Sequence, residues 1–186
     1  MNKMKKYIYN FLQQNNVYLD EDIYSYGFDI TKKYLLFLII VIPINIMNNR
    51  ILEFSIFLFT FISLRQYLGG LHFKNDNICF LFSIIITIFI PLYANNIPKI
   101  SIVIRTFMVI ITFLLVYFIG VVDNENKKLD DIEKKYLQKR AFILLLIFSI
   151  LILLLYDFDY VIFNVILLTI LLMDTNILIA YLKSFL

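Results

Sequence analysis

Long apolar runs, separated by short polar connections, are the feature that most limits what this chain can fold into. Six such runs lie at residues 34–47, 51–64, 77–93, 100–119, 141–156 and 160–182. A helix needs about 20 apolar residues to cross the roughly 30 Å hydrocarbon core of a bilayer. The runs show no alternation of apolar and polar residues, and they are too long for barrel strands. The sequence therefore predicts an all-α, polytopic membrane helical bundle of about six membrane segments, forming a single domain over residues 1–186.

The first two runs are short for a membrane span, because each covers only about 21 Å at a rise of about 1.5 Å per residue. They can span if flanking residues join the helix and Lys32 and Lys33 extend their ammonium groups to the interface. They can instead form a re-entrant pair that the other helices bury. Before the first run, Asp20 is expected to cap a helix that continues into it. Residues 7–12 form either a short amphipathic helix or a frayed end.

The distribution of Lys and Arg predicts how the chain is oriented in the membrane. In the six-span arrangement, all but Arg50, Lys99 and Arg105 of the 17 lysines and arginines lie on the side of the N-terminus. Loops rich in Lys and Arg stay on the cytoplasmic side. Both termini, loop 65–76 and loop 120–140 are therefore expected to face the cytoplasm of a multi-pass protein of the cell membrane.

Reactive side chains are scarce, which excludes several functional classes. The chain has 1 Cys and 1 His, so it cannot form an internal disulfide or, unaided, a zinc site. The sequence contains no H-E-x-x-H and no G-x-S-x-G motif, which argues against a metalloprotease and a serine hydrolase. With 61% hydrophobic residues, the chain is too apolar for a soluble enzyme. No metal, cofactor or nucleic-acid partner is expected.

The single His and the single Cys lie close together, His72 and Cys79 being seven residues apart in the segment RQYLGGLHFKNDNICF. On one unbroken helix this spacing separates them by about 10.5 Å along the axis. That is too far for a nucleophile and its base, which need a hydrogen bond of about 2.6–3.2 Å. A catalytic pair therefore requires a break in the helix.

The sequence offers such a break. Gly69 and Gly70 permit a tight reversal, and three good helix N-caps follow: Asn75, Asp76 and Asn77. A helix that starts there carries Cys79 in its first turn, where the helix dipole favours the thiolate. His72 could then take the thiol proton, and the backbone N–H of Ile78 or Cys79 could form an oxyanion hole. The alternative is that Cys79 only packs as a small side chain and His72 is only solvated.

These residues resemble the AgrB (accessory gene regulator B) family of Gram-positive quorum-sensing peptidases. Its members carry an Arg, a Gly-Gly-x-His turn and a Cys seven residues after the His, which Arg65, Gly69, Gly70, His72 and Cys79 match here. The chain length and the basic loop after the fourth run also fit. The resemblance implies a membrane cysteine endopeptidase that cleaves a short AgrD-like precursor peptide through a Cys thioester. It also implies that the product is closed into a thiolactone or lactone, that the enzyme is a homodimer, and that its active site lies near the cytoplasmic face.

Several residues are expected to support this chemistry. Arg65 can grip a substrate carboxylate, stabilise the turn, or anchor its helix end at the interface. The residue that orients the His is expected to be one of three polar neighbours: Gln66, Asn75 or Asp76. Asp76 can alternatively serve only as the N-cap. Lys127 and Lys128 either attract the acidic tail of the precursor or belong to a solvated basic helix.

Two other functions remain open, a small membrane transporter and a non-enzymatic membrane scaffold. Only Asp174 and Pro43 hint at a transport path through broken or charged helices. Arg105 is expected to extend to the outer interface, and Asp174 to cap a helix or pair inside the bundle. Alternatively, either residue lines a substrate path or supports a dimer contact. The chain also departs from the family pattern in its dispersed lysines and at Phe73, where a small residue is common, and the bulky ring is expected to alter which precursor fits.

Overall fold

The computed structural model describes residues 3–71, 75–122 and 129–183, without the side chain of Asp76. The described residues form seven helices and no strand, which confirms the predicted all-helical fold. The helices are α1 (Lys3–Gln14), α2 (Glu21–Met47), α3 (Ile51–Leu68), α4 (Asp76–Ala94), α5 (Ile102–Ile119), α6 (Asp131–Leu155) and α7 (Tyr160–Lys183). The chain divides into two compact units, Met1–Pro43 and Ile44–Leu186, and each is described by itself. A single domain stays a prediction.

Within the described chain, the six helices α2 to α7 are long and apolar enough to cross a membrane. The two short apolar runs prove to be parts of longer helices, since α2 has 27 residues and α3 has 18. At a rise of about 1.5 Å per residue these helices are about 40 Å and 27 Å long. Both helices are therefore long enough to span, so their length gives no reason to expect a re-entrant pair. The side that each terminus faces stays a prediction.

Helix α6 begins well before its apolar run, so the expected loop 120–140 is partly helical. The Asp130 carboxylate accepts the backbone N–H of Glu133 at 2.6 Å, and the Glu133 carboxylate accepts that of Asp130 at 3.4 Å. This reciprocal capping box starts a helix by satisfying two backbone donors at once. The connection between α5 and α6 is thereby shortened to residues 120–130.

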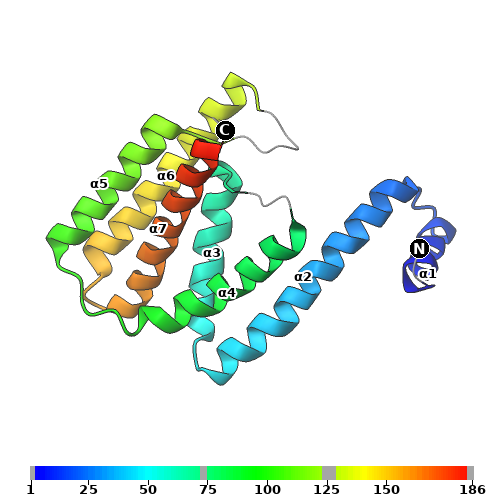
Figure 1. The fold of residues 1–186 in the computed structure, drawn as a ribbon, viewed down its shortest axis with the longest axis horizontal. Coiled ribbons are helices and arrows are strands. Elements are labelled where there is room, and N and C mark those ends of the chain that lie inside the picture. The colour runs from blue at the N-terminus through cyan, green and yellow to red at the C-terminus, as the bar shows by residue number, and fades with distance from the viewer. Residues whose placement is uncertain (1–2, 72–74, 123–128, 184–186) are drawn as a thin grey trace. The chain divides into compact units, whose positions relative to one another are not determined.

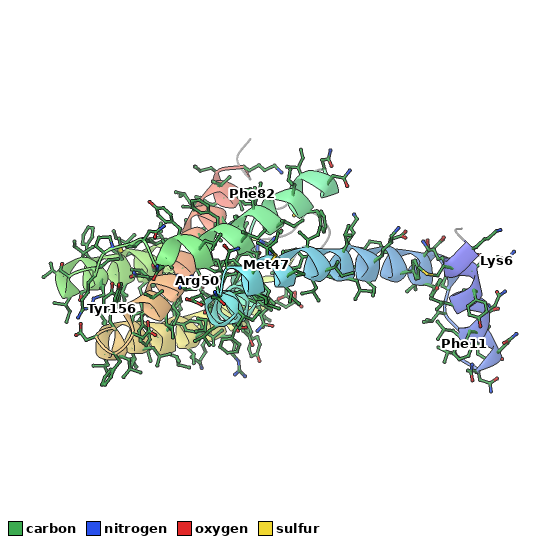
Figure 2. All side chains as sticks on the ribbon, turned by 90° about the horizontal axis from the view of Figure 1, so that it is seen from below. Lys6, Phe11, Met47, Arg50, Phe82 and Tyr156 are labelled. Carbon is green, nitrogen blue, oxygen red and sulfur yellow. The ribbon has the colours of Figure 1, made fainter. Side chains whose placement is uncertain are left out.

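Within the unit Met1–Pro43, α1 packs against the first turns of α2. Lys5 Nζ donates to Asp29 Oδ2 at 2.8 Å, and the hydroxyl of Tyr24 donates to the Lys5 carbonyl at 2.9 Å. The ring of Tyr9 lies 5.0 Å from that of Tyr24. Of the two alternatives for residues 7–12, the structure supports a helix. Helix α1 leaves apolar side chains such as Phe11 exposed, as Figure 2 shows.

Within the unit Ile44–Leu186, α7 is the central helix. It contacts α3, α4, α5 and α6, which surround it in Figure 1. The larger cluster of buried side chains joins α3, α5, α6 and α7 and includes Leu145 and Met173. A smaller cluster joins α3, α4 and α7 through Phe57 and Val165. The position of α7 lets one helix contact both clusters.

A buried polar network lies at the end of the bundle where α6 meets α7, marked by Tyr156 in Figure 2. The Tyr156 hydroxyl accepts the Ile100 N–H at 2.8 Å and donates to Asn164 Oδ1 at 2.8 Å. The Arg105 guanidinium lies 3.9 Å from the Tyr156 ring centroid and donates to the Ile152 carbonyl at 3.0 Å. Arg105 is only 4% exposed. The expectation that it extends to the outer interface is wrong, because the ring and the carbonyl hold it inside.

Asp174 pairs inside the bundle, as expected. Thr112 Oγ1 donates to Asp174 Oδ2 at 2.6 Å and so joins α5 to α7. Neither α7 at Asp174 nor α2 at Pro43 is broken. The described helices therefore lack the interrupted spans that are typical of a transport path.

An exposed ion pair lies near the same end as the Tyr156 network. Lys99 Nζ lies 2.7 Å from Asp157 Oδ1. The hydrogen bond and the charge of Lys99 lower the pKa of the Asp157 carboxyl below its usual value of 3.8. Exposed pairs of this kind contribute little to stability, so the buried network is the stronger restraint on this end.

We expect Tyr156→Phe to destabilise the bundle by about 1–2 kcal/mol, because it leaves the Ile100 N–H and the Asn164 amide without their shared partner. The melting temperature, followed by circular dichroism in detergent, should fall by roughly 2–8 °C. Tyr93→Phe is the matched control, because Tyr93 is 48% exposed. Equal melting temperatures for the two variants would contradict the role of the Tyr156 hydroxyl.

Candidate active site

The reversal after α3 is built on Gly69. Its φ of +75° suits glycine, and its N–H closes the end of α3 by donating to the Arg65 carbonyl at 3.0 Å. A Cβ at this position would collide with the carbonyl oxygen of Val122. The Val122 N–H in turn donates to the Leu68 carbonyl at 3.2 Å. The turn is therefore fixed against the segment that follows α5, and the sequence needs glycine there for both torsion and space.

Arg65 holds the next part of the turn. Its Nη2 donates to the Leu71 carbonyl at 3.2 Å, and its guanidinium lies 5.5 Å from the Phe61 ring centroid. A Cβ at Gly70 would lie 3.9 Å from Arg65 Nη1 and 3.8 Å from the Cβ of Asn176. Of the three expected roles of Arg65, the structure supports stabilisation of the turn, since Arg65 binds the residue immediately before position 72.

Asn176 is a neighbour of the turn that sequence reasoning did not identify. It lies on α7, is 7% exposed, and donates from Nδ2 to the Leu172 carbonyl of its own helix at 2.8 Å. The sequence feature that could have indicated this residue is an amide side chain in a mostly apolar run, two positions after Asp174. Its place beside Gly70 shows that the central helix reaches the candidate site.

Helix α4 begins just after the turn and carries Cys79 near its start, as predicted. Asn75, rather than Asp76, is the N-cap, with its side chain accepting the Asn77 N–H at 2.9 Å. The N–H groups of Ile78 and Cys79 both donate to the Asn75 carbonyl, at 3.1 and 3.2 Å. These two donors are thus already paired, and the expected oxyanion hole is not free in this arrangement. Cys79 itself is partly buried.

The remaining predicted residues are separate from this group or lie outside the described residues. Gln66 is on α3 and exposed. His72, Lys127 and Lys128 lie outside the described residues, as does the side chain of Asp76. The pairing of His72 with Cys79 therefore stays a prediction. In the described parts of the chain, no group of His, Cys, Asp and Glu side chains is suited to hold a metal ion.

Comparisons of this chain with known proteins point to one family. The model of the family described as AgrB, accessory gene regulator B, matches residues 5–179. An AgrB-like protein of Clostridium perfringens strain SM101 is 35% identical over 127 residues, which cover 65% of this chain and 59% of that protein. AgrB-like protein 2 of strain 13 is 33% identical over 127 residues, with the same coverage. The matched part of this chain thus spans 59% of the length of these curated relatives, and no solved structure matches it.

We expect Gly69→Ala to destabilise the turn by about 1–3 kcal/mol, because it combines a positive φ with a collision against the Val122 carbonyl. The measurements are the melting temperature and the rate at which a maleimide alkylates Cys79, the single thiol of the chain. We expect a lower melting temperature and an altered alkylation rate.

Gly27→Ala is the matched control, since a Cβ at Gly27 meets nothing within 4 Å on helix α2. It should leave the alkylation rate unchanged and raise the melting temperature slightly, because alanine favours a helix more than glycine does. Equal effects of the two substitutions would show that the turn does not require glycine at position 69.

Proposed function

Because this chain belongs to the AgrB family, accessory gene regulator B, we propose that it is a membrane cysteine endopeptidase that processes an AgrD-like precursor of a quorum-sensing peptide. The observation that carries the proposal is the location of the only thiol. Cys79 lies partly buried at the start of an apolar helix, directly after a turn that Gly69 and Arg65 fix in place. A nucleophile at the edge of a membrane helix can reach a peptide that lies along the membrane surface.

The proposed reaction proceeds through a thioester. His72 takes the proton of the Cys79 thiol, and the thiolate attacks the scissile carbonyl of the precursor. The peptide C–N bond breaks, and His72 returns the proton to the leaving amine. A thiol or hydroxyl of the bound peptide then attacks the thioester, which closes a thiolactone or lactone and releases the Cys79 thiol. Acyl transfer between thiols conserves the acyl bond energy, so the enzyme mainly has to position the peptide and exclude water.

The start of α4 is where the first step would take place. Cys79 lies in the first turn, at the positive end of the helix dipole. The Asn75 carbonyl already accepts the N–H groups of Ile78 and Cys79, so the developing oxyanion needs a donor from elsewhere or an opening of the cap. His72 is proposed to supply the proton transfer.

Arg65 is proposed as a positioning residue. It binds the Leu71 carbonyl at 3.2 Å, and Leu71 is covalently joined to His72. A guanidinium can donate to this carbonyl while it stacks on Phe61, which a lysine ammonium cannot reproduce. Arg65 would thus restrict where the imidazole can lie relative to Cys79.

The substrate and partner assignments rest on charge and on the family. An acidic precursor tail would be attracted by the cations near the start of α6, for which Lys127 and Lys128 are proposed. The excess of Lys and Arg on the side of the turn supports a site near the cytoplasmic face. A homodimer is proposed from the family resemblance.

We expect Cys79→Ala and His72→Ala each to abolish precursor cleavage, because they remove the nucleophile and the base. The measurement is the conversion of a co-expressed precursor, followed on a gel and by mass spectrometry. Ser55→Ala is the control, since Ser55 is exposed and bonds only within its own helix in the described contacts. Normal cleavage by either active-site variant, at wild-type expression, would refute the proposed peptidase mechanism.

We expect Arg65→Gln to lower kcat by roughly tenfold or more while changing KM little, because it disturbs the placement of His72 rather than substrate binding. The measurement is steady-state cleavage of a synthetic precursor by the reconstituted protein, with Arg65→Lys as the charge-conserving variant. Arg140→Gln, an exposed cation on α6, is the control. A rise in KM with unchanged kcat would instead assign Arg65 to binding a substrate carboxylate.

A further inference from the structure

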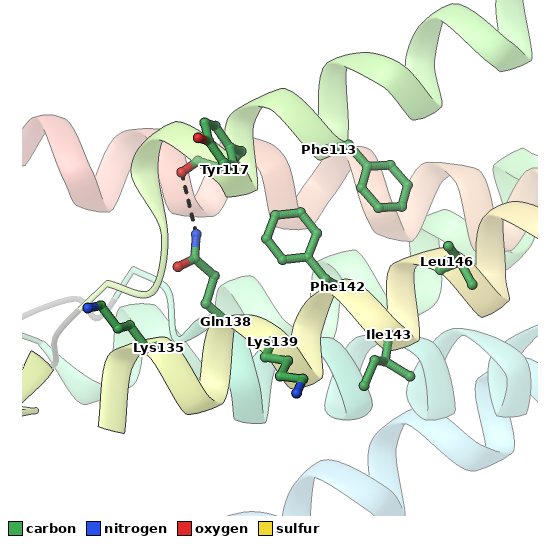
Figure 3. Close-up of a pocket in the computed structure, with 8 residues that line it drawn as sticks. All are labelled: Phe113, Tyr117, Lys135, Gln138, Lys139, Phe142, Ile143 and Leu146. Carbon is green, nitrogen blue, oxygen red and sulfur yellow. Dashed lines mark hydrogen bonds between the residues drawn. The ribbon is translucent and has the colours of Figure 1, made fainter. Parts of the chain in front are cut away.

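A groove separate from the candidate active site runs between α5 and α6, with a volume of about 660 Å³. Figure 3 shows that its two ends differ in character. Lys135, Gln138 and Tyr117 lie at one end, and Phe113 and Leu146 lie at the other. The groove therefore changes from charged to apolar along its length.

This change follows the path of α6 into the membrane. The polar end lies before residue 141, where the apolar run of α6 begins. From Lys135 to Leu146 the helix rises by about 16 Å, close to half of the roughly 30 Å hydrocarbon core. If α6 crosses the membrane, the groove would extend through about one leaflet, with its charges near the interface and its apolar part in the hydrocarbon.

The walls of the groove are held by defined contacts. Gln138 Nε2 donates to the Val116 carbonyl at 2.8 Å and to the Tyr117 carbonyl at 3.4 Å, which ties α6 to the end of α5. Farther along, the rings of Phe113 and Phe142 stack with their centroids 5.9 Å apart. These two contacts keep α5 and α6 in register along the groove.

Among the described residues, no acidic side chain pairs with the cations at the polar end. Lys135 and Lys139 are exposed, lie one helical turn apart, and take part in none of the ion pairs formed among the described residues. The two side chains point apart in Figure 3, and rotation about their flexible stems would bring both ammonium groups to a single phosphate. Lysines near the membrane surface attract anionic headgroups.

We propose that this groove binds one anionic phospholipid, with its phosphate between Lys135 and Lys139 and one acyl chain along Phe142, Ile143 and Leu146. A zwitterionic lipid fills the apolar part equally well but leaves the two positive charges only partly compensated. A free acidic peptide or inorganic phosphate satisfies the charges but not the apolar part. Only an anionic amphiphile matches both ends of the groove.

The test uses the purified full-length protein and native mass spectrometry, with phosphatidylglycerol and phosphatidylcholine of identical acyl chains added in equal amounts. We expect the wild-type protein to retain phosphatidylglycerol preferentially. Lys135→Gln with Lys139→Gln should lower this preference by roughly tenfold or more, whereas Lys135→Arg with Lys139→Arg should keep it.

Lys134→Gln with Arg140→Gln is the matched control, because it removes the same charge from the same helix outside the groove. It should keep the preference, and so should an excess of inorganic phosphate or of a soluble acidic peptide. Filling the apolar half by Ile143→Trp should reduce retention of both lipids.

Three outcomes would overturn the proposal. The first is equal retention of the two lipids by the wild-type protein. The second is an equal loss of preference in the control variant, which would indicate attraction by overall charge rather than by the groove. The third is displacement of the retained lipid by the phosphate or the acidic peptide, which would assign the polar end to a ligand without an acyl chain.

Discussion

The hydrocarbon core of a membrane offers no hydrogen-bond partner, so every polar group between the helices must find its partner within the protein. Two groups of buried polar side chains in the bundle from α3 to α7 meet much of this constraint. Thr112 donates to Asp174 between α5 and α7, and Tyr156 joins Ile100, just before α5, to Asn164 on α7. Arg105 Nε and Thr60 Oγ1 are buried with no hydrogen-bond partner among the described residues. Because α7 carries one partner of each pair, its central position determines how the other helices pack.

The candidate active site depends on the same central helix. The turn after α3 rests against Asn176 of α7 and against Val122 after α5. Arg65 then binds Leu71, the last described residue before His72, so contacts from three parts of the bundle hold the turn. Under the proposed mechanism this support would matter, because small displacements of a base from its nucleophile reduce the rate strongly.

Much of the fold could be predicted from the sequence, and some details could not. The apolar runs predicted six membrane helices, and Asp20 predicted a helix that begins before the first run, as α2 does. The runs did not reveal that α6 begins before its own run. A helix can begin in polar residues when capping side chains, here Asp130 and Glu133, bond the free N–H groups of its first turn. A hydropathy pattern does not reveal such caps. Arg105 was misjudged for a related reason, since its position in the run predicted an interfacial side chain while the ring of Tyr156, distant in sequence, holds it inside.

The sequence by itself determined the number of membrane-length helices, the glycine turn, and the placement of the only thiol near a helix start, because periodicity, torsion and capping are local properties. Only the tertiary structure decided that the turn contacts Asn176 and Val122 and that Arg65 binds Leu71. It also decided that Asn75 accepts the N–H groups nearest to Cys79. The first depends on packing between segments far apart in the chain, and the second on how the turn folds back on the end of its own helix. The third depends on which of three equivalent caps the backbone selects, and local propensity does not distinguish them.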